Sequence, residues 1–175
     1  MYPYNRKTQL YHTSIGAKEK AEKKENSPDL STDRRLLELL QLARQDAAKM
    51  EAKYTALLQT EALTEAAEIL RTMETDTKKH QRILREILFT VFSDTYEDIL
   101  EEIAEKEAET KTAEELLEEL LLTEMDDIIF YRILLSVMDT DDLRELLFEV
   151  LTDKQNHTSA LNYLYAKYFS KTTGQ

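Results

Sequence analysis

The chain has 175 residues, a formal net charge of −12, no cysteine, and no glycine or proline anywhere between residues 29 and 173. Because β-rich and α/β proteins need turn residues at regular intervals, this composition excludes Rossmann folds, barrels and glycine-rich phosphate loops and predicts an all-α protein. The missing cysteines exclude disulfides, thiol nucleophiles and cysteine-bound metal clusters, and the negative charge argues against nucleic acid as a partner.

Residues 1–30 have the composition of a basic tail. Residues 1–28 carry six basic and three acidic side chains, a net charge of +3, whereas the rest of the chain is strongly acidic. The stretch from Lys18 to Ser27 has mixed charge without an apolar period, and Pro28 ends it. We therefore expect a flexible N-terminal tail over 1–30 that could bind a protein partner, followed by one domain over 31–171.

Apolar side chains at alternating steps of three and four residues predict four long helices in this domain. The first helix begins near residue 33, and the second runs from about residue 65 to residue 92. Thr112 with Glu115 forms a capping box that starts the third helix. Asp139 or Thr140 caps the fourth, which ends near residue 168.

The lengths of the connections predict how these helices are joined. The links between the first and second helices and between the third and fourth are short, so each pair forms an antiparallel hairpin. Residues 94–112 form a long connection, with an acidic helix expected at 96–109, and they can cross the length of a bundle. A single long crossover between two hairpins is the topology of ferritin-like four-helix bundles.

An internal repeat relates the two hairpins. Tyr54 and His80 are 26 residues apart, and so are Tyr131 and His157, which gives an offset of 77 residues. The same offset pairs several further identical residues, for example Asp76 with Asp153 and Leu84 with Leu161. The sequence therefore predicts a duplicated helical hairpin.

This pattern resembles the rubrerythrin-type ferritin-like family. The strings Glu-Met-Asp-Asp-Ile-Ile-Phe-Tyr at 124–131 and Leu-Leu-Phe-Glu-Val-Leu-Thr-Asp-Lys-Gln-Asn-His at 146–157 look like its third and fourth helices. The resemblance implies a ferritin-like bundle made of two repeated antiparallel hairpins. It also implies a dinuclear metal centre held by a Glu from the first and third helices and by Glu-x-x-His from the second and fourth.

Half of the six ligand positions that the family implies are replaced in this chain. His80, Glu124 and His157 match the family, whereas Ala47, Thr77 and Lys154 stand where the family has glutamates. The chain is therefore expected to be a degenerate member.

Lys154 bears on whether the core holds metal ions or an ion pair. An ammonium group cannot share a layer with two metal ions without strong repulsion, so we expect Lys154 to replace the metal charge and to pair with Glu124 or Asp127. A metal-free core needs no cofactor. The alternatives are an iron or zinc site made by His80, Glu124 and His157, with Asp127 or Glu51 as additional ligands, and a rebuilt dinuclear site.

The expected function follows from the replaced ligands. We expect a rubrerythrin-related protein without an intact di-iron centre, acting as a metal-binding or structural/interaction protein. An iron-dependent peroxidase or ferroxidase with a non-standard metal site is the alternative, so enzymatic activity stays open. No apolar run is long enough to cross a membrane, and we expect a cytoplasmic protein.

Further expectations concern side chains outside the ligand set. Tyr54 and Tyr131 need hydrogen-bond partners in the core. Asp76 and Asp153, each four residues before a histidine, are expected behind the ligands or exposed to solvent. The outward members of the aromatic run near residue 163 favour a homodimer surface.

Overall fold

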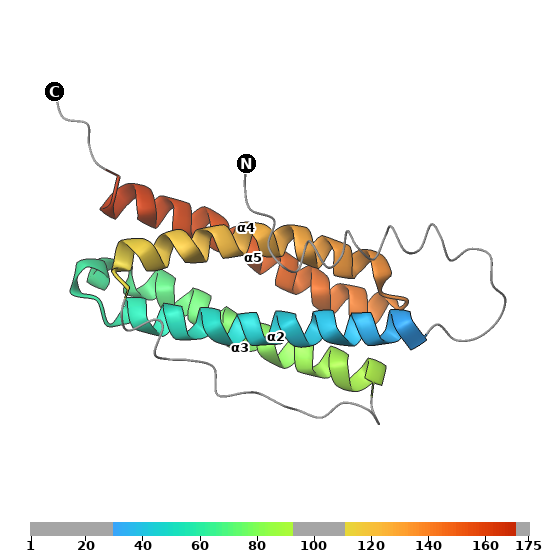
Figure 1. Cartoon of the computed structure of the whole chain (residues 1–175). Helices are drawn as coiled ribbons and strands as arrows, with labels where there is room; N and C mark the ends of the chain where they lie inside the picture. Colours follow the sequence, from blue (N-terminus) through green and yellow to red (C-terminus); the bar gives the residue numbers. More distant parts are fainter. Residues whose placement is uncertain (1–29, 93–110, 171–175) are drawn as a thin grey trace.

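The computed structural model describes residues 30–92 and 111–170 of the chain (Figure 1). These residues form four long helices and one short 3-10 helix and contain no strand, which confirms the prediction of an all-α protein. Residues 1–29 of the tail predicted over 1–30, and the acidic helix predicted over 96–109, lie outside the described residues. In chain order the elements are α2 (Leu30–Leu58), η1 (Glu61–Ala66), α3 (Ala67–Phe92), α4 (Ala113–Val137) and α5 (Asp141–Tyr168).

Two helix starts differ from the sequence prediction. Helix α2 begins at Leu30, before the expected start near Asp33 and one residue before the expected domain boundary. The second predicted helix begins at Ala67 because the 3-10 helix η1 precedes it, with non-helical backbone at Leu63 (φ −111°, ψ 15°). Leu63 lies in the connection between α2 and α3, and its side chain packs into an apolar cluster.

The capping residues of α4 and α5 lie where the sequence places them. Thr112 accepts a hydrogen bond from the backbone N–H of Glu115, whose side chain in turn bonds the Thr112 backbone, so the capping box is confirmed. Thr140, and not Asp139, caps α5 by accepting from the backbone N–H of Leu143. Each cap satisfies a backbone donor that the first helical turn leaves free.

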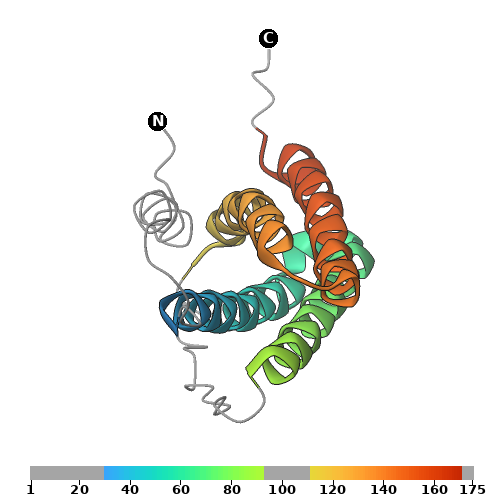
Figure 2. The same cartoon turned by 90° about the vertical axis from the view of Figure 1, so that its right-hand side faces the viewer.

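The four helices form two antiparallel hairpins that pack on each other. Helix α2 packs along α3, α4 packs along α5, and the two pairs meet through contacts of α2 with α4 and of α3 with α5. Figures 1 and 2 show this arrangement from the side and along the bundle. Helix α3 ends and α4 begins at opposite ends of the bundle, so the chain between them connects these two ends (Figure 1).

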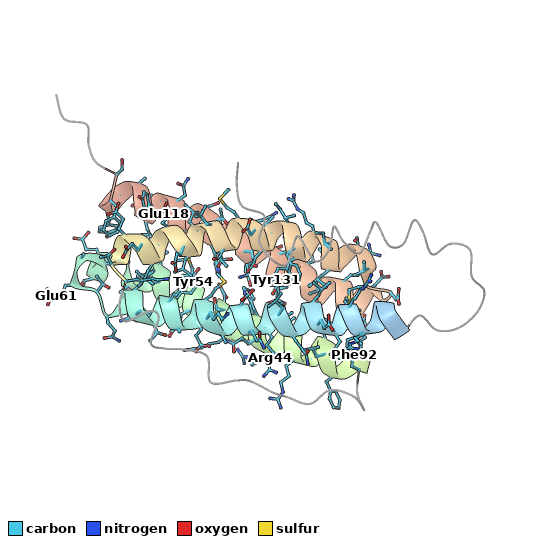
Figure 3. The ribbon with its side chains drawn as sticks, in the orientation of Figure 1. Arg44, Tyr54, Glu61, Phe92, Glu118 and Tyr131 are labelled. Atoms are coloured by element: carbon cyan, nitrogen blue, oxygen red, sulfur yellow. The ribbon has the colours of Figure 1, made fainter. Side chains whose placement is uncertain are left out.

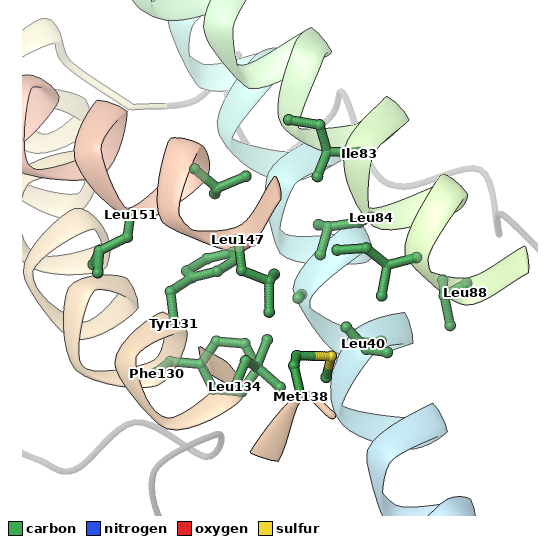
Figure 4. Close-up of a cluster of buried hydrophobic side chains, with 13 residues drawn as sticks. Leu40, Ile83, Leu84, Leu88, Phe130, Tyr131, Leu134, Met138, Leu147 and Leu151 are labelled. Carbon is green, nitrogen blue, oxygen red and sulfur yellow. The ribbon is translucent and has the colours of Figure 1, made fainter. Parts of the chain in front are cut away.

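Apolar side chains fill both halves of the bundle. One cluster takes residues from all four helices, including Leu40, Leu84, Leu134 and Leu147 (Figure 4). A second cluster fills the other half around Leu57, with residues from α2, η1, α3, α4 and α5. Burying a side chain of this size stabilises a fold by about 1.5–3 kcal/mol, so the two clusters supply the main driving force.

A layer of polar side chains lies between the two apolar clusters. Each of its members is at most 2% exposed, so the layer has no free access to water; they are Thr77, His80, Glu124, Asp127, Lys154 and His157. Apolar packing does not explain this buried polar layer. Among the described helices, none combines the length and apolar character of a membrane span.

Candidate functional site

Lys154 lies at the centre of the polar layer and is 1% exposed. Its Nζ is 2.9 Å from Oδ2 of Asp127 and 3.0 Å from Oε2 of Glu124. Both carboxylates come from α4, where a spacing of three residues puts them on one helix face. On the side of α2, Lys154 donates a hydrogen bond to Sδ of Met50 at 3.3 Å. The expected contact with Glu124 is therefore present, and Asp127 joins it.

The opposite charges of Lys154 and Glu124 stabilise the ionised form of both side chains. Burial opposes the charged form of Lys154, but the nearby carboxylates of Asp127 and Glu124 outweigh it and raise the pKa of the lysine. Burial likewise opposes the charged form of Glu124. The Lys154 charge and a hydrogen bond from His157 outweigh it, and the pKa of Glu124 is lowered. Both side chains are therefore ionised at neutral pH.

The second oxygen of Glu124 joins two more helices to the site. The hydroxyl of Tyr54, on α2, donates to Oε1 at 2.9 Å. Nδ1 of His157, on α5, lies 3.0 Å from the same oxygen. Burial and the charge of Glu124 raise the pKa of Tyr54 well above its ordinary value, so this hydroxyl stays a donor. Figure 3 shows Tyr54 among the side chains that fill the space between the helices.

Two histidine–aspartate contacts connect α3 and α5 in a reciprocal way. Nε2 of His157 is 3.2 Å from Oδ2 of Asp76, and Nε2 of His80 is 3.0 Å from Oδ2 of Asp153. The two ring centroids are 5.8 Å apart. The 77-residue offset makes Asp76 the counterpart of Asp153 and His80 the counterpart of His157. Exchanging each residue of one contact for its counterpart therefore gives the other contact. Each aspartate thus bonds the histidine of the other hairpin.

His80 is held in its neutral form. Burial lowers its pKa, and the charges of Lys154 and His157 act in the same direction, against the hydrogen bond to Asp153. Within the described part of the chain, its Nδ1 is buried without a hydrogen-bond partner. Both observations fit a neutral ring that carries its proton on Nε2 and donates it to Asp153.

Lys79 completes the contacts of Asp153 at the surface. Its Nζ is 2.7 Å from Oδ2 of Asp153 and 2.9 Å from Oε1 of Glu149. Burial raises the pKa of Asp153, but hydrogen bonds from His80 and Lys79 outweigh this effect and lower it to about 2. Asp153 is therefore a charged acceptor that fixes the orientation of His80.

The remaining candidate ligand, Glu51, does not join this site, and neither does Thr77, which stands at a ligand position that the resemblance implies. Glu51 is turned toward α3, where it accepts a hydrogen bond from Gln81 and lies 3.7 Å from Lys78, so the structure does not bring it to His80 or His157. The hydroxyl of Thr77 donates back to the carbonyl of Met73, one turn earlier, at 2.7 Å.

Asp76 and Asp153 were expected behind the ligand positions or in solvent, and the first alternative fits the structure, because each bonds a histidine. In each case the histidine belongs to the other hairpin. Sequence reasoning did not find Met50, whose sulfur accepts a hydrogen bond from Lys154. The 77-residue offset contained a signal for the aspartates, because it pairs them together with the histidines.

The side chains present do not fit the dinuclear metal centre that the family resemblance implies. Lys154 places a positive charge within 3.0 Å of both carboxylates of α4, where metal ions would need them. Glu124 and His157 bond each other directly instead of facing a shared position. Among the described residues, no group of three or more His, Asp or Glu side chains is arranged to hold a metal ion.

Comparisons of the chain with protein-family models, with curated proteins and with solved structures found no match. The site is therefore interpreted from its own geometry. It contains an ammonium group that contacts two carboxylates of α4, and a hydrogen-bonded chain from Tyr54 through Glu124 and His157 to Asp76. This arrangement holds charges in fixed positions.

Proposed function

We propose that the chain is a ferritin-like bundle of the rubrerythrin type in which an ionic network centred on Lys154 occupies the place of a dinuclear metal centre. The packing order supports this proposal, because α2 contacts α3 and α4 while α5 contacts the same two helices. The link from α3 to α4 joins opposite ends of the bundle, as a single crossover requires (Figure 1). The reciprocal His–Asp contacts fit two hairpins related by a 77-residue repeat.

The contact of Lys154 with Glu124 and Asp127 is the observation that carries the proposal. A buried carboxylate without a counter-charge costs several kcal/mol or takes up a proton. In the family the metal ions supply the counter-charge, and in this chain the ammonium group does so. Thr77 and Ala47, which stand at two other family ligand positions, are buried and uncharged.

The function that follows is that of a structural or interaction protein. The network fixes the relative position of all four helices, since Tyr54, His80, Glu124 and His157 come from α2, α3, α4 and α5. It thereby defines one packing of a bundle whose apolar clusters alone would tolerate others. Di-iron chemistry is not part of this proposal.

Metal analysis of protein purified without chelators tests the proposal. We expect iron, zinc and manganese at well below one ion per chain. Ferrous iron added in air should be oxidised no faster than in buffer alone. The variant Lys154→Gln is compared with the parent in both assays, because it removes the core cation and has a side chain of similar length. Stoichiometric metal in the parent chain, or rapid oxidation with a peroxo or oxo-bridged absorption band, would overturn the proposal in favour of an iron-dependent oxidoreductase.

A further inference from the structure

The outer face of α4 carries a stripe of apolar side chains. Leu122, Met125 and Ile129 are 42%, 42% and 49% exposed, and their steps of three and four residues place them on one side of the helix. This side is opposite the one that carries Glu124, Asp127 and the buried leucines. We refer to these three residues as the α4 stripe.

The other helices do not show such a stripe. The remaining large apolar side chains that are exposed in the described residues are scattered over α3 and α5 and include no three at consecutive helical steps. They are Ile69, Phe89, Val91, Phe148 and Tyr163. An amphipathic helix in a bundle normally shows charged side chains to solvent, so a helix that is apolar on both sides indicates a second packing partner.

The charges at the two ends of the stripe identify the partner. Glu118 lies seven residues before Met125, and Arg132 lies seven residues after it. Both are exposed, and neither forms an ion pair within the described part of the chain. Figure 3 shows Glu118 on the side of α4 that faces away from α2. A surface with an acid and a base at equal distances from its centre is complementary to itself when one copy is turned by 180°.

We propose that the α4 stripe is the interface between two copies of this chain, which pair α4 against α4 in antiparallel orientation about a twofold axis at Met125. Turning one copy by 180° brings Glu118 of each chain opposite Arg132 of the other. It also places Leu122 of each chain near Ile129 of the other, because these residues lie on either side of the axis. The antiparallel orientation is favoured by the helix dipoles as well.

Charge reversal tests this pairing with an internal complementation. We expect the full chain to sediment as a dimer. Glu118→Lys sets two cations against each other at both ends of the interface, and Arg132→Glu does the same with two anions. Each variant alone should raise the dimer dissociation constant on the order of tenfold or more. Mixing the two should restore a dimer, because each chain then supplies the charge that the other one needs.

Controls on other helices separate this effect from a general effect of charge. Arg71→Glu on α3 and Glu145→Lys on α5 make the same changes of charge at exposed positions. They should leave the dimer unchanged. Far-UV circular dichroism of all four variants checks that the helices are intact.

A cross-link gives a second, independent readout. The chain has no cysteine, so Met125→Cys introduces a single thiol. Two such thiols on a twofold axis between packed helices lie within disulfide distance, and mild oxidation should give a covalent dimer. Ser159→Cys, on the exposed side of α5, should not cross-link. A parent chain that is monomeric at every concentration would overturn the proposal and leave the α4 stripe to residues 1–29 or to another protein. A dimer that resists both charge reversals would overturn it too.

Discussion

Lys154 sets the charge of the buried layer, since its ammonium group lies between Glu124 and Asp127 without access to water. A buried ion pair adds little net stability compared with apolar residues of the same size, but breaking it leaves an uncompensated charge. The network is therefore sensitive to single substitutions and tolerant of paired ones.

Lys154→Met should lower the free energy of unfolding by about 3–5 kcal/mol, because it leaves two carboxylates in the core without a cation. The double variant Lys154→Met, Asp127→Leu should recover part of this loss, because it leaves one carboxylate without a cation instead of two. In the double variant Glu124 keeps its hydrogen bonds from Tyr54 and His157. Urea denaturation measures both values. A single variant as stable as the parent would show that the pair is not formed.

His80 should make the protein less stable in mild acid. Its pKa in the folded state is below 6.5, so the unfolded chain binds more protons as the pH falls through this range, and the free energy of unfolding decreases. The pKa values of Glu124 and Asp153 are lowered from 4.5 and 3.8, so these carboxylates stabilise the fold, and their contribution is lost only at still lower pH.

The measurement is urea denaturation at several pH values between neutral and about 5.5, a window set by the ordinary histidine pKa. His80→Gln should flatten the dependence on pH in this window. An unchanged slope in the variant would mean that His80 is not held neutral in the folded protein.

Sequence reasoning found some of these residues and missed others for a physical reason. Lys154 and Glu124 were predicted to lie together because both match ligand positions that the family resemblance implies for one helix hairpin. The partners of the histidines could not be found in this way. His80 bonds Asp153 and not Asp76, which is four residues before it in its own helix, and this choice depends on how closely α3 and α5 pack.

At the level of the helices, the caps determine where α4 and α5 begin. Thr112 has a complete capping box, whereas Thr140 accepts one longer hydrogen bond, at 3.4 Å, from the backbone of Leu143. Thr112→Ala should therefore cost about 1–2 kcal/mol and Thr140→Ala about 0.5–1 kcal/mol, within the range measured for N-caps.

Thermal and urea unfolding of the two variants measure this difference. Thr152→Ala is a matched control, because its hydroxyl bonds the carbonyl of Phe148 inside α5 and caps nothing. Equal losses for the two cap variants and the control would contradict the assignment of the caps.

The helices themselves could be predicted because caps and apolar spacing are local signals. The 3-10 helix η1 could not, since its sequence has no proline or glycine to mark a break. Within this 3-10 helix the backbone leaves helical dihedral angles at Leu63, whose side chain packs into the apolar cluster shared with α2, α3, α4 and α5.

At the scale of the whole molecule, the direction and order of the helices follow from the lengths of the connections. Short links predicted the two hairpins, and the positions of the ends of α3 and α4 agree with a long crossover (Figure 1). The sequence did not predict the apolar outer face of α4. Apolar residues lie on both sides of this helix, so their spacing shows only a weak helical period. The interface proposed for it is therefore an inference from exposure and charge.

We propose that an ionic network centred on Lys154 takes the place of two metal ions. Anaerobic titration with ferrous iron tests this proposal by comparing the parent with the variant Ala47→Glu, Thr77→Glu, Lys154→Glu. The variant places a carboxylate at each of the three positions where the resemblance implies a glutamate, and it removes the core cation. We expect no stoichiometric binding by the parent and two ions per chain in the variant. Tight binding of iron by the parent, or no gain in a folded variant, would show that the Lys154 network does not replace the metal ions.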